Sequence, residues 1–282
     1  MDFSVCTSVY RNDKPEYLDL ALKSIINQTV PPNEIVLVID GPISSKLEKI
    51  IQDALEHFKL KVIRLQENQG LGIAMKIGVE AASCELIARM DSDDIALSDR
   101  FEKQINCFKA DENLSIVGGA ITEFIDEPTN IVAKRQCPKS DEEIKKYMKS
   151  RCGLNHMTVM FKRSEILKVG NYQDWFWNED YYLWIRMILA NCKFYNLSDV
   201  LVNVRVGKDM YARRAGWRYF KSEMALQKYM RKERLISLWH FGYNVGIRFV
   251  IQLLMPNNLR GIIFRNFFFV IIITIIYNLF IC

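Results

Sequence analysis

The chain has 282 residues, half of them hydrophobic and a quarter charged, so it is long and apolar enough to bury a core and is not intrinsically disordered. Its seven cysteines are scattered singly without a Cys-x-x-Cys pair, and the first apolar run follows no signal-peptide pattern, which favours a reducing compartment. The net charge of +5 is uneven, because Arg205–Arg265 holds thirteen basic and three acidic residues, a balance of +10, and the remainder carries −5. We therefore expect an acidic body, residues 1–210, and a basic, aromatic C-terminal region, residues 211–282.

The first ninety residues alternate between short apolar runs and stretches of helical periodicity. The expected strands are 3–10, 34–39, 61–65 and a central one from Glu85, and the expected helices are one from Pro15 to before Pro31, then 47–58 and 73–82. This alternation predicts a parallel sheet with helical crossovers.

The pattern continues less regularly to about residue 210, where we place the end of a single globular domain. The expected elements are a helix over 100–110, a strand over 115–124, a loop over 126–140, a charged helix over 141–150, a strand over 157–162 and a helix over 181–190. Beyond them, 217–239 is expected to be one helix that is both basic and aromatic.

The central strand ends in three carboxylates, Asp91, Asp93 and Asp94. Open α/β sheets bind ligands at the carboxyl ends of their strands. Carboxylates this close repel one another, and a divalent cation relieves that repulsion. A cation held by only one or two protein carboxylates keeps room for the phosphates of a substrate. This favours Mg²⁺ or Mn²⁺ carrying a diphosphate. The alternative is a polar turn that caps the next helix.

Two further groups have the same two interpretations. Asp40 and the glycine-bearing turn 68–72 follow strands, so they are either ligand contacts or ordinary turns. Glu179 and Asp180 open a helix after an aromatic run. Asp180 is either a general base or a structural residue, with Asp180 or Asn178 capping the helix. Trp175 and Trp177 suit stacking on a sugar as well as packing in a core.

The arginine pair Arg213 and Arg214 suits a departing diphosphate or an anionic lipid surface equally. Residues 267–282 are sixteen uncharged residues, whose helix would reach about 24 Å against a hydrocarbon core of about 30 Å. We therefore expect a tail inserted in the membrane or lying at its interface, at the cytoplasmic face of the inner membrane. A lone histidine such as His156 is more often structural than a ligand.

Taken in order, these segments resemble the family 2 glycosyltransferases, which have the GT-A fold. The resemblance covers roughly residues 3–205 and is carried by 4–13, 24–29, 36–41, 68–72, 90–94 and 178–184. It implies a Rossmann-like α/β domain followed by a C-terminal helical membrane-associating tail. It also implies an inverting displacement, in which an acceptor hydroxyl attacks the anomeric carbon of a sugar as the diphosphate leaves.

The resemblance also implies roles for individual residues. Tyr10 and Asp40 would line a uridine pocket, with Asn68 and Arg89 close by. Asp91 would touch ribose or metal, and Asp93 would hold Mn²⁺ or Mg²⁺. Asp180 would be the catalytic base with Glu179 beside it, and Arg213 and Arg214 would neutralise the leaving group. Some relatives place a metal-ligating histidine after the base, whereas the next histidine here is His240, inside the C-terminal region.

The opening residues and the loop 210–217 are similar to bacterial O-antigen and capsule transferases. Such enzymes move galactose or glucose from a UDP-sugar to a lipid-linked acceptor, a GlcNAc or GalNAc on undecaprenyl diphosphate. Two other classes stay open: a nucleotidyltransferase, and a non-catalytic membrane-associated protein that binds sugar nucleotides. Nucleic acid is not an expected partner, since the aromatics among the basic residues suit a bilayer at least as well.

Overall fold

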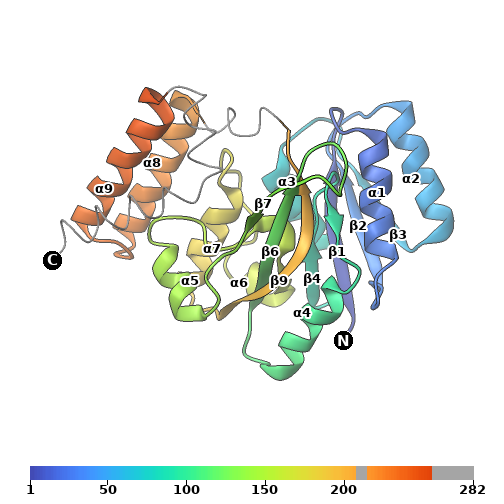
Figure 1. Cartoon of the computed structure of the whole chain (residues 1–282), viewed down its shortest axis with the longest axis horizontal. Helices are drawn as coiled ribbons and strands as arrows, with labels where there is room; N and C mark the ends of the chain where they lie inside the picture. Colours follow the sequence, from blue (N-terminus) through green and yellow to red (C-terminus); the bar gives the residue numbers. More distant parts are fainter. Residues whose placement is uncertain (208–214, 256–282) are drawn as a thin grey trace. The chain divides into compact units, whose positions relative to one another are not determined.

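The computed structural model describes residues 1–207 and 215–255 of the chain (Figure 1). The chain divides into two compact units, Met1–Arg205 and Val206–Cys282. The first unit carries the mixed sheet and the helices that pack on it, and the second carries two further helices in its described part.

The first half of the larger unit is the predicted alternation of strands and helices. Its elements are β1 (Phe3–Val9), α1 (Pro15–Ile26), β2 (Glu34–Ile39), α2 (Ser45–His57), β3 (Leu60–Arg64), α3 (Leu71–Ala81) and β4 (Leu86–Arg89). The strands lie in the order β3-β2-β1-β4 and all pair in parallel, so their carboxyl ends share one edge of the sheet. β2 is buried at all six positions, as a strand covered on both faces should be.

The second half departs from the expected parallel sheet. Its strands are β5 (Ile95–Ala96), β6 (Ile116–Phe124), β7 (Ile131–Arg135), β8 (Met160–Lys162) and β9 (Phe194–Arg205). The order continues as β4-β8-β6-β9-β5, with β8 antiparallel to β4 and to β6. β9 pairs with β6 in parallel. The sheet is therefore mixed, and the parallel sheet predicted for the first ninety residues is confirmed for β1 to β4.

Two of these strands correct the sequence analysis. The segment 126–140 is not wholly loop, because β7 pairs with β6 and leaves Ile131 and Val132 exposed, 55% and 46%. An edge strand of this kind lacks the buried apolar face that a pattern search detects. β9 went unpredicted, and its partner β6 precedes it by about 80 residues.

The helices of this half are mostly as expected. They are α4 (Arg100–Ala110), α5 (Asp141–Tyr147), α6 (Arg163–Lys168) and α7 (Glu179–Leu189). Ser140 and Glu143 form a capping box that starts α5. The expected strand over 157–162 is shorter, because His156–Thr158 forms a 3₁₀ turn. α7 begins at Glu179, two residues earlier than expected, so both acidic residues lie in its first turn.

The described part of the second unit is a helical pair, α8 (Trp217–Lys232) and α9 (Leu238–Phe249), followed by a π-helical turn, Val250–Leu254. The expected single helix over 217–239 is wrong: the chain breaks at Arg234, whose φ is 59°, and Ser237 caps α9. Arg248 pairs with the buried Glu223, and Asn244 donates to Gln227 at 2.8 Å. None of the described helices combines the length and apolarity needed to cross a membrane. The expected tail over 267–282 lies outside the described residues.

Candidate active site

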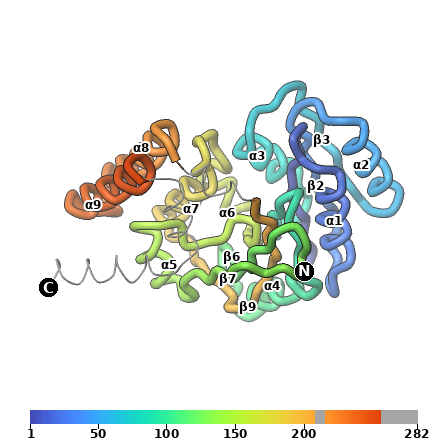
Figure 2. Tube along the Cα trace, turned by 45° about the horizontal axis from the view of Figure 1, so that its top comes forward, coloured from blue at the N-terminus to red at the C-terminus, as the bar shows by residue number. Residues whose placement is uncertain are grey.

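The carboxyl ends of β1, β2 and β4 bring together residues that are far apart in the sequence. β1 pairs in register with both neighbours, with Val9 opposite Ile39 and Cys6 opposite Arg89. Tyr10, Asp40 and the segment 91–94 therefore leave the sheet at the same edge. Figure 2 shows β2 and β3 surrounded by α1, α2 and α3. The sequence predicted that Asp40 and Asp91 would lie at the same edge of the sheet, and the pairing of β2 and β4 with β1 places them there.

Asp40 organises the turn that follows β3. Its carboxylate accepts hydrogen bonds from Asn68 Nδ2 at 2.9 Å and from the backbone N–H groups of Gln69 at 2.7 Å and Gly70 at 2.9 Å. Close packing requires glycine at position 41, where a Cβ atom would lie 2.7 Å from the backbone nitrogen of Asn68. Asp40 and Asn68, paired in the sequence prediction, are thus in direct contact.

Asp91, Asp93 and Asp94 form a cluster in which each residue offers a carboxylate oxygen, all within 4.8 Å of one another. Asp91 pairs with Arg89, whose Nη1 donates to Asp91 Oδ2 at 2.7 Å. Arg89 is only 2% exposed, so its guanidinium fixes Asp91 from inside the protein. Asp94 accepts from the backbone N–H of Arg205 at 2.9 Å, while its other oxygen is buried without a hydrogen-bond partner.

Burial and charge repulsion make this cluster a candidate cation site. Burial, together with the charges of Asp91 and Asp13, raises the pKa of Asp93 to about 7. Burial, followed by the charges of Asp91 and Asp93, raises the pKa of Asp94 well above its ordinary value. A divalent cation would relieve the repulsion and take up the unpartnered oxygen. The oxygen donors suit Mg²⁺ and Mn²⁺, and the residues therefore fit such a metal.

Sequence reasoning missed Asp13, which links the end of β1 to this cluster. Its Oδ2 accepts from Ser92 Oγ at 2.8 Å and from the backbone N–H of Tyr10 at 3.1 Å. Burial raises the pKa of Asp13, with a smaller contribution from the charge of Asp91. Its place four residues after the end of β1 was the available signal. The ring of Tyr10 beside it is 38% exposed, accessible to a ligand.

The first turn of α7 adds two carboxylates near the same edge. A Cβ atom added at Gly72, in the first turn of α3, would lie 3.2 Å from Cβ of Glu179, so the two helices start in contact. Burial, followed by the charge of Asp180, raises the pKa of Glu179 to about 7. The charge of Arg89 lowers this pKa, and the charge of Asp91 raises it. The N-cap position of α7 belongs to Asn178, the other cap that the sequence offered, and the Asp180 carboxylate accepts a hydrogen bond from the backbone N–H of Tyr181 at 2.7 Å.

The aromatic residues before α7 divide into exposed and packed ones. Trp177 is 48% exposed and stacks on Phe176 at 4.9 Å between ring centroids, whereas Trp175 packs on Tyr182 at 4.2 Å. Deeper in the unit, His156 Nε2 lies 2.9 Å from the hydroxyl of Tyr172. Burial lowers the pKa of His156 well below its usual range, in line with the structural role expected for it.

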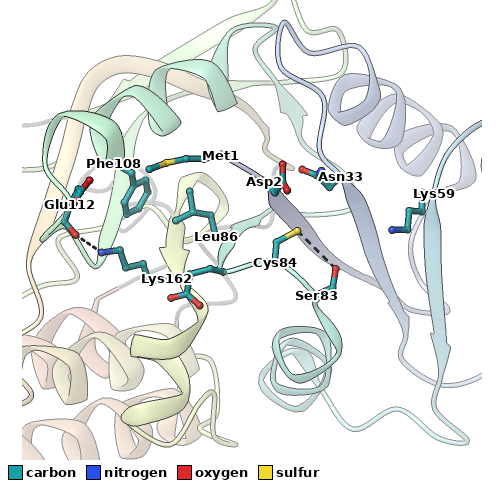
Figure 3. A pocket seen from close by; sticks show the side chains of 11 residues that line it. Met1, Asp2, Asn33, Lys59, Ser83, Cys84, Leu86, Phe108, Glu112 and Lys162 are labelled. Carbon is teal, nitrogen blue, oxygen red and sulfur yellow. Dashed lines mark hydrogen bonds between the residues drawn. The ribbon is translucent and has the colours of Figure 1, made fainter.

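Of the remaining residues singled out in the sequence, the structure describes His240 but not the arginine pair. Arg213 and Arg214 fall outside the described residues, so the predicted roles of this pair stay predictions. His240 lies in the first turn of α9, in the second unit. A groove of about 790 Å³ opens at the amino ends of the parallel strands, lined by Met1, Asn33, Lys59, Ser83 and Leu86 among others (Figure 3). It contains none of the predicted site residues.

The mixed α/β sheet with its carboxylate-lined edge has the fold of the GT-A type of nucleotide-sugar transferases, and solved structures share this fold. Staphylococcus aureus TarS 1–349 in complex with UDP-GlcNAc superposes with a TM-score of 0.64 at 16% identity, over 89% of this chain and 73% of that one. The mannosyltransferase PcManGT from Pyrobaculum calidifontis, in complex with GDP-Man and Mn²⁺, gives 0.61 at 15% identity, over 92% and 71%.

Sequence comparison identifies the family. The model of Glycosyl transferase family 2 matches residues 4–167. An Escherichia coli UDP-Gal:alpha-D-GlcNAc-diphosphoundecaprenol beta-1,3-galactosyltransferase is 34% identical over 264 residues, 94% of this chain and 95% of that protein. The amylovoran biosynthesis glycosyltransferase AmsE of Erwinia amylovora is 39% identical over 226 residues, 80% and 84%. An uncharacterized Haemophilus influenzae glycosyltransferase is 37% identical over 267 residues, 95% and 99%.

The chain therefore belongs to glycosyltransferase family 2, and the protein is a glycosyltransferase. This confirms the resemblance seen in the sequence and removes the nucleotidyltransferase and the non-catalytic binding protein as alternatives. The family match ends before α7, so the roles of Glu179 and Asp180 stay predictions.

Proposed function

We propose that this glycosyltransferase moves a hexose, galactose or glucose, from a UDP-sugar to a saccharide carried on undecaprenyl diphosphate, in O-antigen or capsular polysaccharide synthesis. The observation that carries the proposal is the meeting of two acidic groups at one sheet edge, the strand-end aspartates and the first turn of α7. The choice of sugar and acceptor is supported by the 34% identity to the galactosyltransferase described above.

The strand-end residues would bind the donor. Tyr10 is exposed, and the Asp40 carboxylate accepts a hydrogen bond from Asn68. These three residues would therefore line a pocket for uridine. Asp91 and Asp93 would hold Mn²⁺ or Mg²⁺, which when bound offsets the negative charge of a diphosphate. Arg89 holds the Asp91 carboxylate in place, whether Asp91 contacts the metal or the ribose.

The first turn of α7 would serve the acceptor. Asp180 would take the proton from the acceptor hydroxyl as its oxygen bonds to the anomeric carbon, and the bond from that carbon to the diphosphate breaks on the opposite side. One displacement of this kind inverts the anomeric configuration. Burial and the charge of Asp180 raise the pKa of Glu179 to about 7, so this residue can carry a proton near neutral pH.

A donor screen tests the proposal. Purified protein is given Mn²⁺ and each common UDP-sugar, and the slow release of UDP is followed without an acceptor. We expect release from one UDP-sugar. Asp180→Asn should lower turnover by at least about 10²-fold while donor binding persists, since only the proton acceptor is lost.

Asp93→Ala is the companion variant, and it should abolish metal-dependent donor binding. The two substitutions thereby separate the donor side of the site from the base. Equal loss of donor affinity in both variants would contradict these roles. Failure of every UDP-sugar to bind would overturn the choice of uridine.

We further propose that the enzyme works at the cytoplasmic face of the inner membrane, where a lipid-linked acceptor is found. The C-terminal region carries the basic excess of the chain. The described part of the second unit exposes Trp217, Leu238, Trp239 and Leu254, each more than half exposed. Basic residues with exposed apolar side chains suit an anionic lipid surface.

A further inference from the structure

Arg205, the last residue of β9, makes three hydrogen bonds beside the aspartate cluster. Its backbone N–H donates to Asp94 Oδ1 at 2.9 Å, and its Nε donates to the carbonyl oxygen of Asp93 at 3.2 Å. Its Nη1 donates to the carbonyl oxygen of Asp126 at 2.8 Å. One residue therefore ties the end of β9 to the aspartate segment and to the turn after β6.

Two aromatic rings hold the guanidinium in this place. The guanidinium carbon lies 3.8 Å from the ring centre of Tyr17, in α1, and 4.6 Å from that of Phe124, at the end of β6. A planar cation between rings is restricted in both position and orientation. Among the described residues, Arg205 forms no ion pair with a carboxylate, which distinguishes it from Arg89.

The position of Arg205 has a consequence for the Asp93 side chain. The hydrogen bond from Arg205 Nε to the Asp93 carbonyl oxygen fixes the peptide group that joins Asp93 to Asp94. The hydrogen bond from the backbone N–H of Arg205 fixes the carboxylate of Asp94. The pairing of β5 with β9, with Ile95 opposite Asn203, holds the same segment one residue further on. A site for a small divalent cation needs its ligands held closely, because Mg²⁺ and Mn²⁺ tolerate little distortion.

We propose that Arg205 is a positioning residue for the metal site, and that it sets the affinity of Asp91 and Asp93 for a divalent cation without touching the cation. The inference rests on the metal-binding part of the proposed function. Lysine would keep the charge but would lose the fork that reaches two carbonyl groups and the flat face that stacks on the rings.

Arg163 offers a matched control. Its guanidinium also donates to two backbone carbonyls, those of Val79 and Glu80, each at 3.0 Å, at the carboxyl end of α3. Arg163→Met and Arg205→Met therefore remove the same kind of contact, one away from the aspartate cluster and one beside it. A comparison of the two separates a general loss of structure from a specific effect on the metal site.

The experiment is a titration of the full-length protein with Mn²⁺ alone, followed by electron paramagnetic resonance, with thermal unfolding measured on the same samples. We expect Arg205→Met to weaken Mn²⁺ binding by about tenfold, the scale of a lost hydrogen bond to a charged group. Arg205→Lys should recover part of the loss, and Arg163→Met should leave Mn²⁺ binding unchanged.

Two outcomes would overturn the inference. The first is wild-type Mn²⁺ affinity in Arg205→Met, even if the variant is less thermally stable. The second is a wild-type protein that binds no Mn²⁺. A protein that binds Mn²⁺ and responds to the Arg205 substitutions, yet binds no UDP-sugar, would support the role of Arg205 and contradict the proposed function instead.

Discussion

Glu179 shows how burial sets the chemistry of a single side chain in this site. Burial, followed by the charge of Asp180, raises its pKa from an ordinary 4.5 to about 7. The folded protein therefore binds a proton at Glu179 more tightly than the unfolded chain does. Between pH 4.5 and 7 the folded state holds the additional proton, so this residue makes stability fall as the pH rises through that window.

Glu179→Gln should therefore be more stable than the wild type at pH 8 and should show a weaker decline from pH 5 to pH 8. Thermal midpoints measured across this range test the prediction. Glu143 gives a control of opposite sign, because hydrogen bonds from Ser140 lower its pKa. Glu143→Gln should be less stable than the wild type at pH 8. A Glu179→Gln profile parallel to that of the wild type would contradict the account.

Asp40 is a residue whose loss should affect both stability and binding. Asp40→Ala removes the acceptor of three hydrogen bonds, including those from the backbone N–H groups of Gln69 and Gly70. We expect a loss of roughly 1–3 kcal/mol in the free energy of unfolding, the usual consequence of an unmade buried hydrogen bond. Denaturant unfolding measures this loss, and UDP titration should show weaker binding in the folded fraction. Unchanged stability would mean that the turn keeps its shape without Asp40.

At the scale of elements, the sequence predicts what depends on neighbours along the chain. β2 and α4 have the predicted bounds, because a buried apolar run and a helical period are local patterns. β9 has no such pattern, since polar residues such as Asn196 and Asp199 interrupt it, and its partner β6 is remote in sequence. For the same reason Asp40 and Asp91 could be proposed as strand-end residues, whereas the contacts of Asp13 and Arg205 required the folded structure.

The contact between β6 and β9 depends on small residues. A Cβ atom at Gly119 would lie 2.5 Å from Cδ1 and 2.6 Å from Cγ of Leu201, closer than packed atoms allow. Gly119→Ala should therefore push the strands apart and lower stability by about 1–3 kcal/mol. Gly242→Ala, in α9 with open space around the added atom, should raise stability by up to about 1 kcal/mol, since alanine favours helices. Chemical denaturation of both variants provides the comparison.

At the scale of the whole molecule, the chain combines a unit that carries the sheet and the candidate active site with a second unit of opposite net charge, whose described part is a helical pair. The described helical pair has polar residues inside, Glu223 with Arg248 and Gln227 with Asn244. It exposes tryptophan and leucine, as at Leu238 and Trp239, which are 68% and 66% exposed. The transfer of such exposed apolar side chains into a bilayer interface is favourable.

The substitutions Leu238→Glu and Trp239→Glu together should release the protein from vesicles that contain anionic lipid, with affinity lowered at least about tenfold because two apolar side chains no longer enter the interface. Folding should persist, since both side chains are exposed. Vesicle flotation measures the effect. Leu20→Glu, at a leucine of α1 that is 41% exposed, is the control and should bind as the wild type does. Equal binding by all three proteins would contradict the assignment of this surface.

The pairing of β5 with β9 also bears on how the enzyme is made. The aspartate segment leaves β4 early in the chain, but the strand that follows it pairs with residues 202 and 203, about 107 positions later. Closing so long a stretch of chain is slow and must precede the bonds from Arg205. During synthesis, we therefore expect the parallel half to form first, and the aspartate cluster to reach its final arrangement only after residue 205 has left the ribosome.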